Sequence, residues 1–277
     1  MPPLPPVDTV PLFAPMHEEL IRLLRGLSAD EWERPATPRW RVRDVAAHLL
    51  DGDVRRLSAG RDGLALRPDV PIAGYDDLVG WLNWLNAEWV GVARRMSPAV
   101  ITSLLETTGP QVTAFLATLD ADAPALYPVG WAGEETSANW MDIGREFTER
   151  WHHQQQIRDA VGRPGLTEAR WMRPVLALSM RALPRAYAGV DSAEGACVAF
   201  AVDGDGGGAW SLRRVDSAWT LREEGSAACA CTVRMDADTA WRVLLHALPP
   251  EQARGRLAVD GDAALAEPFL HARAVMV

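Results

Sequence analysis

The feature that most constrains the fold is a change in the spacing of apolar residues about two thirds of the way along the chain. Up to about residue 189, apolar positions recur every three or four residues, as Leu20, Leu24 and Leu27 do. This spacing is typical of helices that bury one face. Later, short apolar segments separated by turns rich in Gly and Asp indicate strands. The 277 residues therefore predict a helical part followed by a smaller part of mixed helices and strands.

Local signals divide the first part into separate helices. Ser28 and Glu31 form the pattern of a capping box. Ser97 and Pro98 supply an N-cap and a first-turn proline, and Gly162 ends the last helix of this part. Helices are expected at about residues 12–27, 42–59, 76–96, 97–119 and 137–161, with a linking helix at 167–189.

The second part predicts an α+β domain. Strands are expected at residues 197–202, 209–215, 218–222 and 228–235, then a helix at 236–247, the segment 256–261 and a last helix ending near residue 274. A tight hairpin is expected at Asp216 and Ser217. We place the domains at residues 1–165 and 166–277; the boundary lies near Gly189 instead if the linking helix belongs to the first domain.

Composition excludes several classes of function. All 28 basic residues are arginine, so the chain has no lysine for a Schiff base or for a phosphate-binding P-loop. The net charge of −9 argues against a nucleic-acid partner, because phosphate backbones are normally bound by a basic surface. A nucleic-acid partner is therefore not expected.

The chain carries no sign of a membrane segment. No apolar run reaches the roughly 18–20 residues that span a bilayer, and the proline-rich start lacks the regions of a signal peptide. Cytoplasmic residence without a membrane partner is the resulting expectation. The three cysteines Cys197, Cys229 and Cys231 are interpreted as small core residues, and not as a disulfide framework or a metal site.

An unusual polar stripe follows one face of the helix expected at 137–161. Glu149 and His153 lie four residues apart, so their Cβ atoms are about 5–6 Å apart and their side chains can converge. His48, on the helix expected at 42–59, is a candidate third ligand. Two imidazoles and one carboxylate suit zinc and leave positions open for water or substrate. The alternative is a metal-free bundle in which these polar groups hydrogen-bond to one another.

The neighbours of these residues leave several interpretations open. His152 adjoins His153 but lies about 100° around the helix from it, so His153 is preferred as the ligand. Gln156, one turn further on, could orient a ligand. Glu146 could do the same, or be an exposed residue paired with Arg150.

The three remaining histidines are interpreted as surface or helix-end residues, and not as ligands. They are His17, His246 and His271.

Three segments together resemble the mycothiol-dependent maleylpyruvate isomerase family. They are Trp40 to His48, Arg145 to His153 leading to Gly162, and Val259 to Asp262. The resemblance covers nearly the whole chain. It implies an N-terminal DinB-like four-helix bundle and a C-terminal α+β domain of sterol carrier protein-like character.

The resemblance also implies a chemistry. A divalent metal, usually zinc, would be held by His48, Glu149 and His153. Mycothiol or a similar low-molecular-weight thiol would add to the substrate's double bond and leave after rotation. A metal lowers the pKa of a bound thiol, which favours the reactive thiolate. The step from Gly255 to Arg256 resembles one at which an arginine reaches toward the active site, so Arg256 is expected to bind a substrate carboxylate.

We therefore expect a metal-dependent, thiol-using isomerase or thiol transferase acting on a small electrophile. Its partners would be that substrate and the thiol, and both a monomer and a homodimer remain open. A non-catalytic metal- or ligand-binding protein and a metal-dependent hydrolase are the alternatives.

Overall fold

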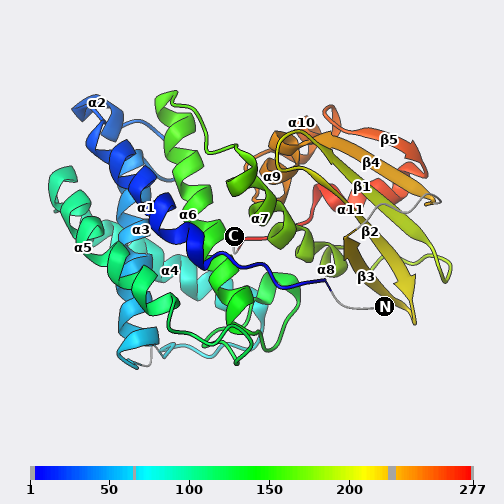
Figure 1. Ribbon diagram of the computed structural model, residues 1–277, viewed down its shortest axis with the longest axis horizontal. Helices are drawn as coiled ribbons and strands as arrows, with labels where there is room; N and C mark the ends of the chain where they lie inside the picture. Colours follow the sequence, from blue (N-terminus) through cyan, green and yellow to red (C-terminus); the bar gives the residue numbers. More distant parts are fainter. Residues whose placement is uncertain (1–3, 65–66, 224–228, 276–277) are drawn as a thin grey trace. The chain divides into compact units, whose positions relative to one another are not determined.

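The computed structural model describes residues 4–64, 67–223 and 229–275, and the chain forms two compact units (Figure 1). The helical unit contains Asp8–Leu126 and Glu149–Leu166. The sheet unit contains Tyr127–Thr148 and Thr167–Met276, together with Met1–Val7. Helix α6 runs through both units. The domain boundary at residue 165 stays a prediction.

The helical unit contains the helices expected from the spacing of its apolar residues. Its complete elements are α1 (Val10–Arg25), α2 (Ala29–Trp32), α3 (Val42–Arg55), the π-helix η1 (Arg56–Arg61), α4 (Tyr75–Ala93) and α5 (Pro98–Leu116). Helix α6 spans Asn139–Val161, and its second half, from Glu149, also belongs to this unit. Both expected caps are confirmed: Ser28 and Glu31 make the reciprocal bonds of a capping box, and Ser97 Oγ accepts from the Val100 amide. Local sequence therefore sets where these helices begin.

The core of the helical unit lies around α3. Its fully buried residues include Val42, Val45 and Leu105, and α3 packs against both α4 and α5. The expected α-helix to residue 59 ends early, at Arg55, and continues as the π-helix. Gly60 in that turn lies close to α5, because a Cβ atom there would be 2.8 Å from Phe115 Cε1. The close approach requires glycine.

The sheet unit alternates short helices with strands. In order, its elements after the first half of α6 are α7 (Ala169–Ser179), η3 (Met180–Ala182), α8 (Leu183–Ala186), β1 (Cys197–Asp203), β2 (Gly208–Val215), β3 (Ala218–Glu223), β4 (Cys231–Asp236), α9 (Ala237–Leu244), α10 (Pro250–Arg254), β5 (Ala258–Gly261), η4 (Ala263–Ala266) and α11 (Glu267–Leu270); the short η2 (Gly130–Ala132) precedes α6. The expected linking helix at 167–189 is therefore broken into three pieces. The sequence did not predict α10.

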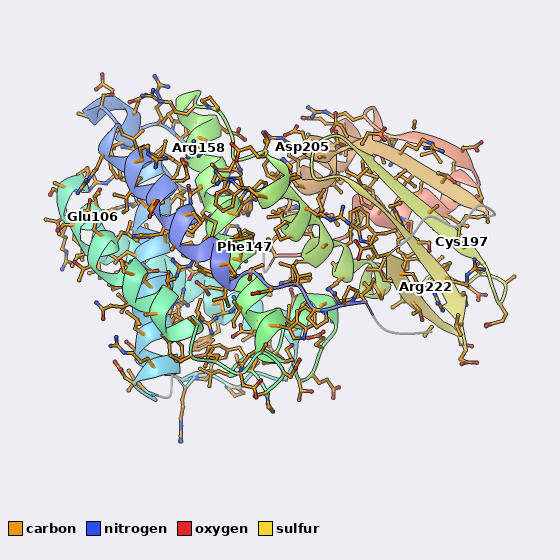
Figure 2. All side chains as sticks on the ribbon, viewed as in Figure 1. Glu106, Phe147, Arg158, Cys197, Asp205 and Arg222 are labelled. Atoms are coloured by element: carbon orange, nitrogen blue, oxygen red, sulfur yellow. A yellow bond between two sulfur atoms is a disulfide. The ribbon has the colours of Figure 1, made fainter. Side chains whose placement is uncertain are left out.

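The five strands form one sheet in the order β3-β2-β1-β4-β5. β1 pairs in parallel with β4, and the other neighbours are antiparallel. The expected hairpin between β2 and β3 is confirmed, because Asp216 and Ser217 have φ values of 50° and 66°. In this unit, Phe147 of α6, labelled in Figure 2, packs against Trp171, and the centroids of the two rings are 6.5 Å apart. The α+β character predicted for the second part is present.

The interpretation of all three cysteines as small core residues was wrong for two of them. Cys197 and Cys229 form a disulfide, with Cα atoms 4.5 Å apart, and Cys197 is labelled in Figure 2. Because β1 and β4 are parallel neighbours, the residue that opens β1 lies beside the residues that precede β4. The Ala230 amide donates to the Cys197 carbonyl at this point. Cys231 is a buried free thiol.

In the part of the chain that the structure describes, no helix combines the length and the apolar character needed to cross a membrane.

Candidate metal centre

A turn before α3 positions His48. The backbone amide of Trp40 donates to Thr37 Oγ1 over 2.9 Å, and its carbonyl accepts from the Ala36 amide over 2.9 Å. The Trp40 ring then lies against the imidazole of His48, with ring centroids 4.9 Å apart. His48 is therefore held on one side by an aromatic ring.

The second half of α6 brings the other two predicted ligands to the same place. His153 Nε2 lies 3.4 Å from Glu149 Oε2. The rings of His48 and His153 meet edge to face, with centroids 4.7 Å apart. The side chain of Glu149 is 27% exposed and that of His153 is 10% exposed. The structure thus brings His48 of α3 next to His153 and Glu149 of α6, which lie much further along the chain, and the exposure of Glu149 shows that solvent reaches this group.

Hydrogen bonds to the main chain fix the rotation of α6. Gln154 Nε2 donates to the Met16 carbonyl over 3.0 Å. Gln155 makes two bonds to Leu166, as donor to its carbonyl and as acceptor from its amide. Because these side chains leave the helix on other faces, they hold Glu149 and the histidines toward α3.

Gln156 and His152 lie directly beside the predicted ligands. Gln156 Oε1 is 2.8 Å from His153 Nδ1, and Gln156 Nε2 is 3.2 Å from His152 Nε2. The rings of His152 and His153 lie nearly parallel, with centroids 5.5 Å apart, and His152 is buried. Gln156 therefore bridges the two histidines.

Sequence reasoning missed a second polar stripe, on α3. Asp44, His48, Asp51 and Arg55 are spaced four, three and four residues apart, which puts them on one helix face. Asp51 pairs with Arg55 at 2.8 Å, and Arg55 also donates to Asn86 Oδ1 over 2.8 Å. Burial raises the pKa of Asp51. The same periodicity test that drew attention to α6 would have found this stripe.

A separate polar cluster joins α3, α5 and α6, and we call it the buried ion-pair cluster. It consists of Asp53, Arg150 and Thr108. Arg150 Nη2 lies 2.5 Å from Asp53 Oδ1, and Thr108 Oγ1 donates to Asp53 Oδ2 over 2.5 Å. Asp53 is fully buried and Arg150 is 7% exposed. The carboxylate of Asp53 and the guanidinium of Arg150 are buried as a pair of opposite charges, as buried charged groups usually are.

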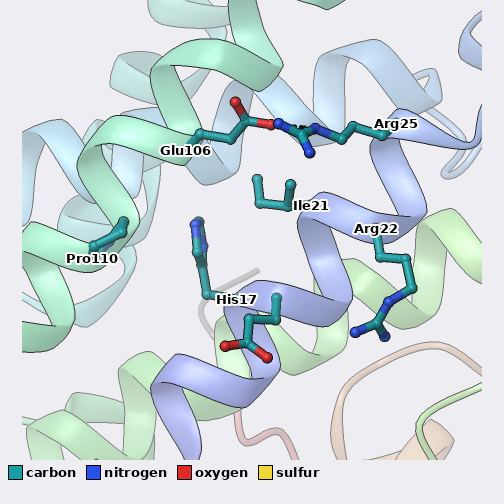
Figure 3. Close-up of a pocket in the computed structure, with 7 residues that line it drawn as sticks. His17, Ile21, Arg22, Arg25, Glu106 and Pro110 are labelled. Carbon is teal, nitrogen blue, oxygen red and sulfur yellow. Dashed lines mark ion pairs between the residues drawn. The ribbon is translucent and has the colours of Figure 1, made fainter.

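The interpretation of His17 as a surface or helix-end residue was wrong, because it lies within α1 and both its ring nitrogens are buried. Its ring packs on Gly109 of α5 so closely that a Cβ atom there would lie 2.1 Å from His17 Cε1. Burial is the largest influence on His17, and it lowers the pKa of the imidazole. A surface pocket beside it, drawn in Figure 3, is lined by His17, Glu18, Ile21, Arg22, Arg25, Glu106 and Pro110. None of the predicted metal ligands lines that pocket.

The other predicted site residue, Arg256, belongs to the sheet unit. It follows α10, its side chain is 47% exposed, and its Nη1 lies 3.6 Å from Asp238 Oδ2. Its contact with a substrate stays a prediction. Among the described residues, no three His, Cys, Asp or Glu side chains are already placed to hold a metal ion.

Comparisons with known proteins give the following matches. The family model described as Mycothiol maleylpyruvate isomerase N-terminal domain matches residues 13–158. A crystal structure of a mycothiol-dependent maleylpyruvate isomerase is similar over 95% of this chain and 98% of that chain, with a TM-score of 0.53 and 13% identity. A histidine-to-alanine mutant of such an isomerase matches over the same shares, with a TM-score of 0.52 and 12% identity. No curated protein matches. At these identities the structural likeness shows the fold.

Proposed function

Because the chain belongs to the mycothiol maleylpyruvate isomerase family, by a match to its N-terminal domain over residues 13–158, we propose that it uses a low-molecular-weight thiol in a metal-dependent reaction. The family resemblance expected from the sequence is thereby confirmed. In this proposal the reaction is an isomerisation or a thiol transfer on a small electrophile. The helical unit is a DinB-like four-helix bundle, and the sheet unit is a sterol carrier protein-like α+β domain.

The observation that carries the proposal is the meeting of His48 with Glu149 and His153. Two imidazoles and a carboxylate are a ligand set that zinc accepts, and three protein ligands leave a position for a thiol. The side chain of Glu149 is 27% exposed, so this candidate ligand is in contact with solvent. Binding an ion requires these side chains to draw closer than they lie in the structure.

Each residue then has a defined role. A divalent ion bound here would lower the pKa of a thiol, so that the thiolate is present at neutral pH. His48, Glu149 and His153 hold the ion, and Trp40 limits the rotation of His48. Arg256 binds a substrate carboxylate through its guanidinium group. Thiolate addition makes the substrate's double bond single, which permits rotation, and loss of the thiolate restores the double bond.

The experiment is a turnover assay on zinc-loaded protein. Maleylpyruvate and other small electrophiles with activated double bonds are offered with mycothiol, with other thiols and without thiol. We expect turnover that needs both zinc and thiol, and that His153→Ala abolishes. His271→Ala is the matched control, because this histidine is exposed in the sheet unit.

Two other outcomes would replace the proposal. Hydrolysis of esters or amides that proceeds without thiol would identify a metal-dependent hydrolase. Zinc binding without turnover of any substrate in the panel would favour a non-catalytic metal- or ligand-binding protein.

A further inference from the structure

Three consecutive glutamines on α6 make different contacts. Gln154 and Gln155 bind main-chain groups of Met16 and Leu166. Gln156 alone binds side chains, and both of its partners are histidines. A glutamine that served only to anchor the helix would need no imidazole partner, so the contacts of Gln156 call for a different explanation.

With the Gln156 amide oriented as it is in the structure, its two contacts determine which ring nitrogens carry protons. Its Oε1 atom can only accept a hydrogen bond, so His153 Nδ1, 2.8 Å away, is the donor. Its Nε2 atom can only donate, so His152 Nε2, 3.2 Å away, is the acceptor. In the neutral rings, both protons therefore sit on Nδ1, and both Nε2 atoms carry lone pairs.

This tautomer has a consequence at Glu149. His153 Nε2 faces Glu149 Oε2 at 3.4 Å, so a lone pair faces a carboxylate oxygen. Two electron-rich atoms at this distance repel each other unless a proton on Nε2 or a bound cation lies between them. A divalent ion would satisfy both atoms, because neutral imidazole nitrogen and carboxylate oxygen are its usual ligands.

We propose that Gln156 is a positioning residue that holds His153 in the Nδ1-protonated form and so directs Nε2 toward the metal. The metal-binding half of this inference rests on the proposed function, whereas the tautomer half does not. His152 is the anchor of the amide: it accepts from Gln156 Nε2 and thereby keeps Oε1 pointed at His153. This gives the adjacent histidine a role without making it a ligand.

The opposite orientation of the amide defines the rival state. Rotation of the Gln156 amide by half a turn would present its NH₂ group to His153 Nδ1. His153 would then carry its proton on Nε2 and donate it to Glu149. Both ligand atoms would be consumed in an internal hydrogen bond, so Gln156 would oppose metal binding instead of favouring it.

The tautomers can be read by nitrogen-15 NMR of the histidine rings in metal-free protein, at a mildly alkaline pH where imidazole is neutral. We expect protonated Nδ1 and unprotonated Nε2 in both His152 and His153. Gln156→Leu should give a mixture of tautomers in both rings. Gln154→Leu is the control on the same helix and should leave both unchanged. A proton on His153 Nε2 in the wild type would overturn the inference.

Metal affinity gives an independent test, by competition for Zn²⁺ with a chromophoric chelator. Partners of metal-binding histidines typically contribute roughly 10- to 100-fold in affinity, and we expect such a loss in Gln156→Leu. Gln156→Glu keeps an acceptor for His153 Nδ1 and should restore most of the affinity. Equal affinity of Gln156→Leu and wild type would overturn the metal-directing role.

The two proposals fail in different ways. If no variant binds Zn²⁺ but the tautomers follow the expected pattern, the proposed function fails and the assignment of Gln156 as the residue that sets the tautomer stands. If the wild type binds Zn²⁺ and its metal-free form carries the proton on His153 Nε2, the role of Gln156 is wrong and the metal site stands.

Discussion

The same two helices, α3 and α6, carry two polar clusters of opposite character. In the buried ion-pair cluster, Asp53 meets Arg150 at 2.5 Å and also accepts from Thr108. In the candidate metal centre, the close contact is between Glu149 and His153, a carboxylate and an imidazole. In the first cluster the two charged groups are buried and opposite in sign. The second is half-buried and combines electron-pair donors.

The comparison shows that one pair of helices can carry a polar cluster whose loss would affect stability and a second cluster that is available for binding. A buried carboxylate is tolerated when a cation and a hydroxyl satisfy it, so removal of either Asp53 or Arg150 would leave the other charge buried without its partner. The candidate ligands His48, Glu149 and His153 are proposed to bind an external ion, so they are expected to stabilise the metal-free fold less than the ion pair does. The clusters therefore predict contrasting responses to mutation.

The largest effect is expected in the buried ion-pair cluster. Asp53→Ala leaves the guanidinium of Arg150 buried without its carboxylate, which typically costs about 3–5 kcal/mol. Chemical unfolding would measure the free energy. The control is Arg22→Ala, which removes an exposed pair with Glu19 and should cost less than about 1 kcal/mol. A loss as small as that of the control would show that the buried cluster is not a stabilising one.

The next effect tests how tightly α1 packs on α5 beside this cluster. Gly109→Ala would ordinarily favour a helix, but here the new Cβ atom would overlap the ring of His17. We expect a loss of about 1–3 kcal/mol, as overpacking usually causes. In a double-mutant cycle with His17→Ala, most of that loss should disappear. Additive losses would mean that the imidazole moves aside.

A smaller effect is expected in the pH dependence of stability, because the charges of the buried ion-pair cluster act on the pKa of His17. Burial is the largest influence on the pKa of His17 and lowers it. Asp53 raises this pKa and Arg150 lowers it, while Glu106 and Glu18 raise it by smaller amounts. When the folded pKa lies below the unfolded value of about 6.5, the unfolded state binds the proton first as pH falls. Stability should therefore decrease as pH falls through that value, until the folded pKa is passed.

His17→Phe keeps a ring in this position but cannot titrate. Unfolding free energies measured between neutral and mildly acidic pH should fall less steeply in this variant than in the wild type. An unchanged slope would mean that His17 takes up its proton equally well in the folded and unfolded chain.

The smallest change in stability, with the opposite sign, is expected at the candidate metal centre. Glu149→Gln replaces a carboxylate oxygen with an amide that can donate to His153 Nε2. In metal-free protein this should raise stability by about 1 kcal/mol, the usual contribution of a hydrogen bond. The same variant should bind Zn²⁺ more weakly. Loss of stability in the metal-free variant would show that the wild-type carboxylate is already satisfied within the protein.

Local features of the fold were predictable from sequence. The capping box at Ser28 and the N-cap at Ser97 depend on residues three positions apart, so they appear in the sequence itself. The hairpin at Asp216 and Ser217 is similarly local. The closeness of Glu149 to His153 followed from helical spacing, and His48 was a candidate third ligand that the family resemblance then supported.

Contacts between distant segments were not predictable in this way. The disulfide between Cys197 and Cys229 depends on β1 lying parallel to β4. The order of strands in the sheet cannot be predicted from the sequence of either strand alone. The packing of His17 on Gly109 depends on the approach of two helices. Asp51 is a different case, because its spacing of three residues from His48 is visible in the sequence itself.

The most direct test of the account is the metal content of protein purified without an affinity metal and then incubated with Zn²⁺, measured by mass spectrometry. We predict about one divalent ion per chain in the wild type and in His271→Ala, and loss of that ion in His153→Ala. A wild type that holds no more metal than His153→Ala after incubation would contradict the claim that His48, Glu149 and His153 form a metal site.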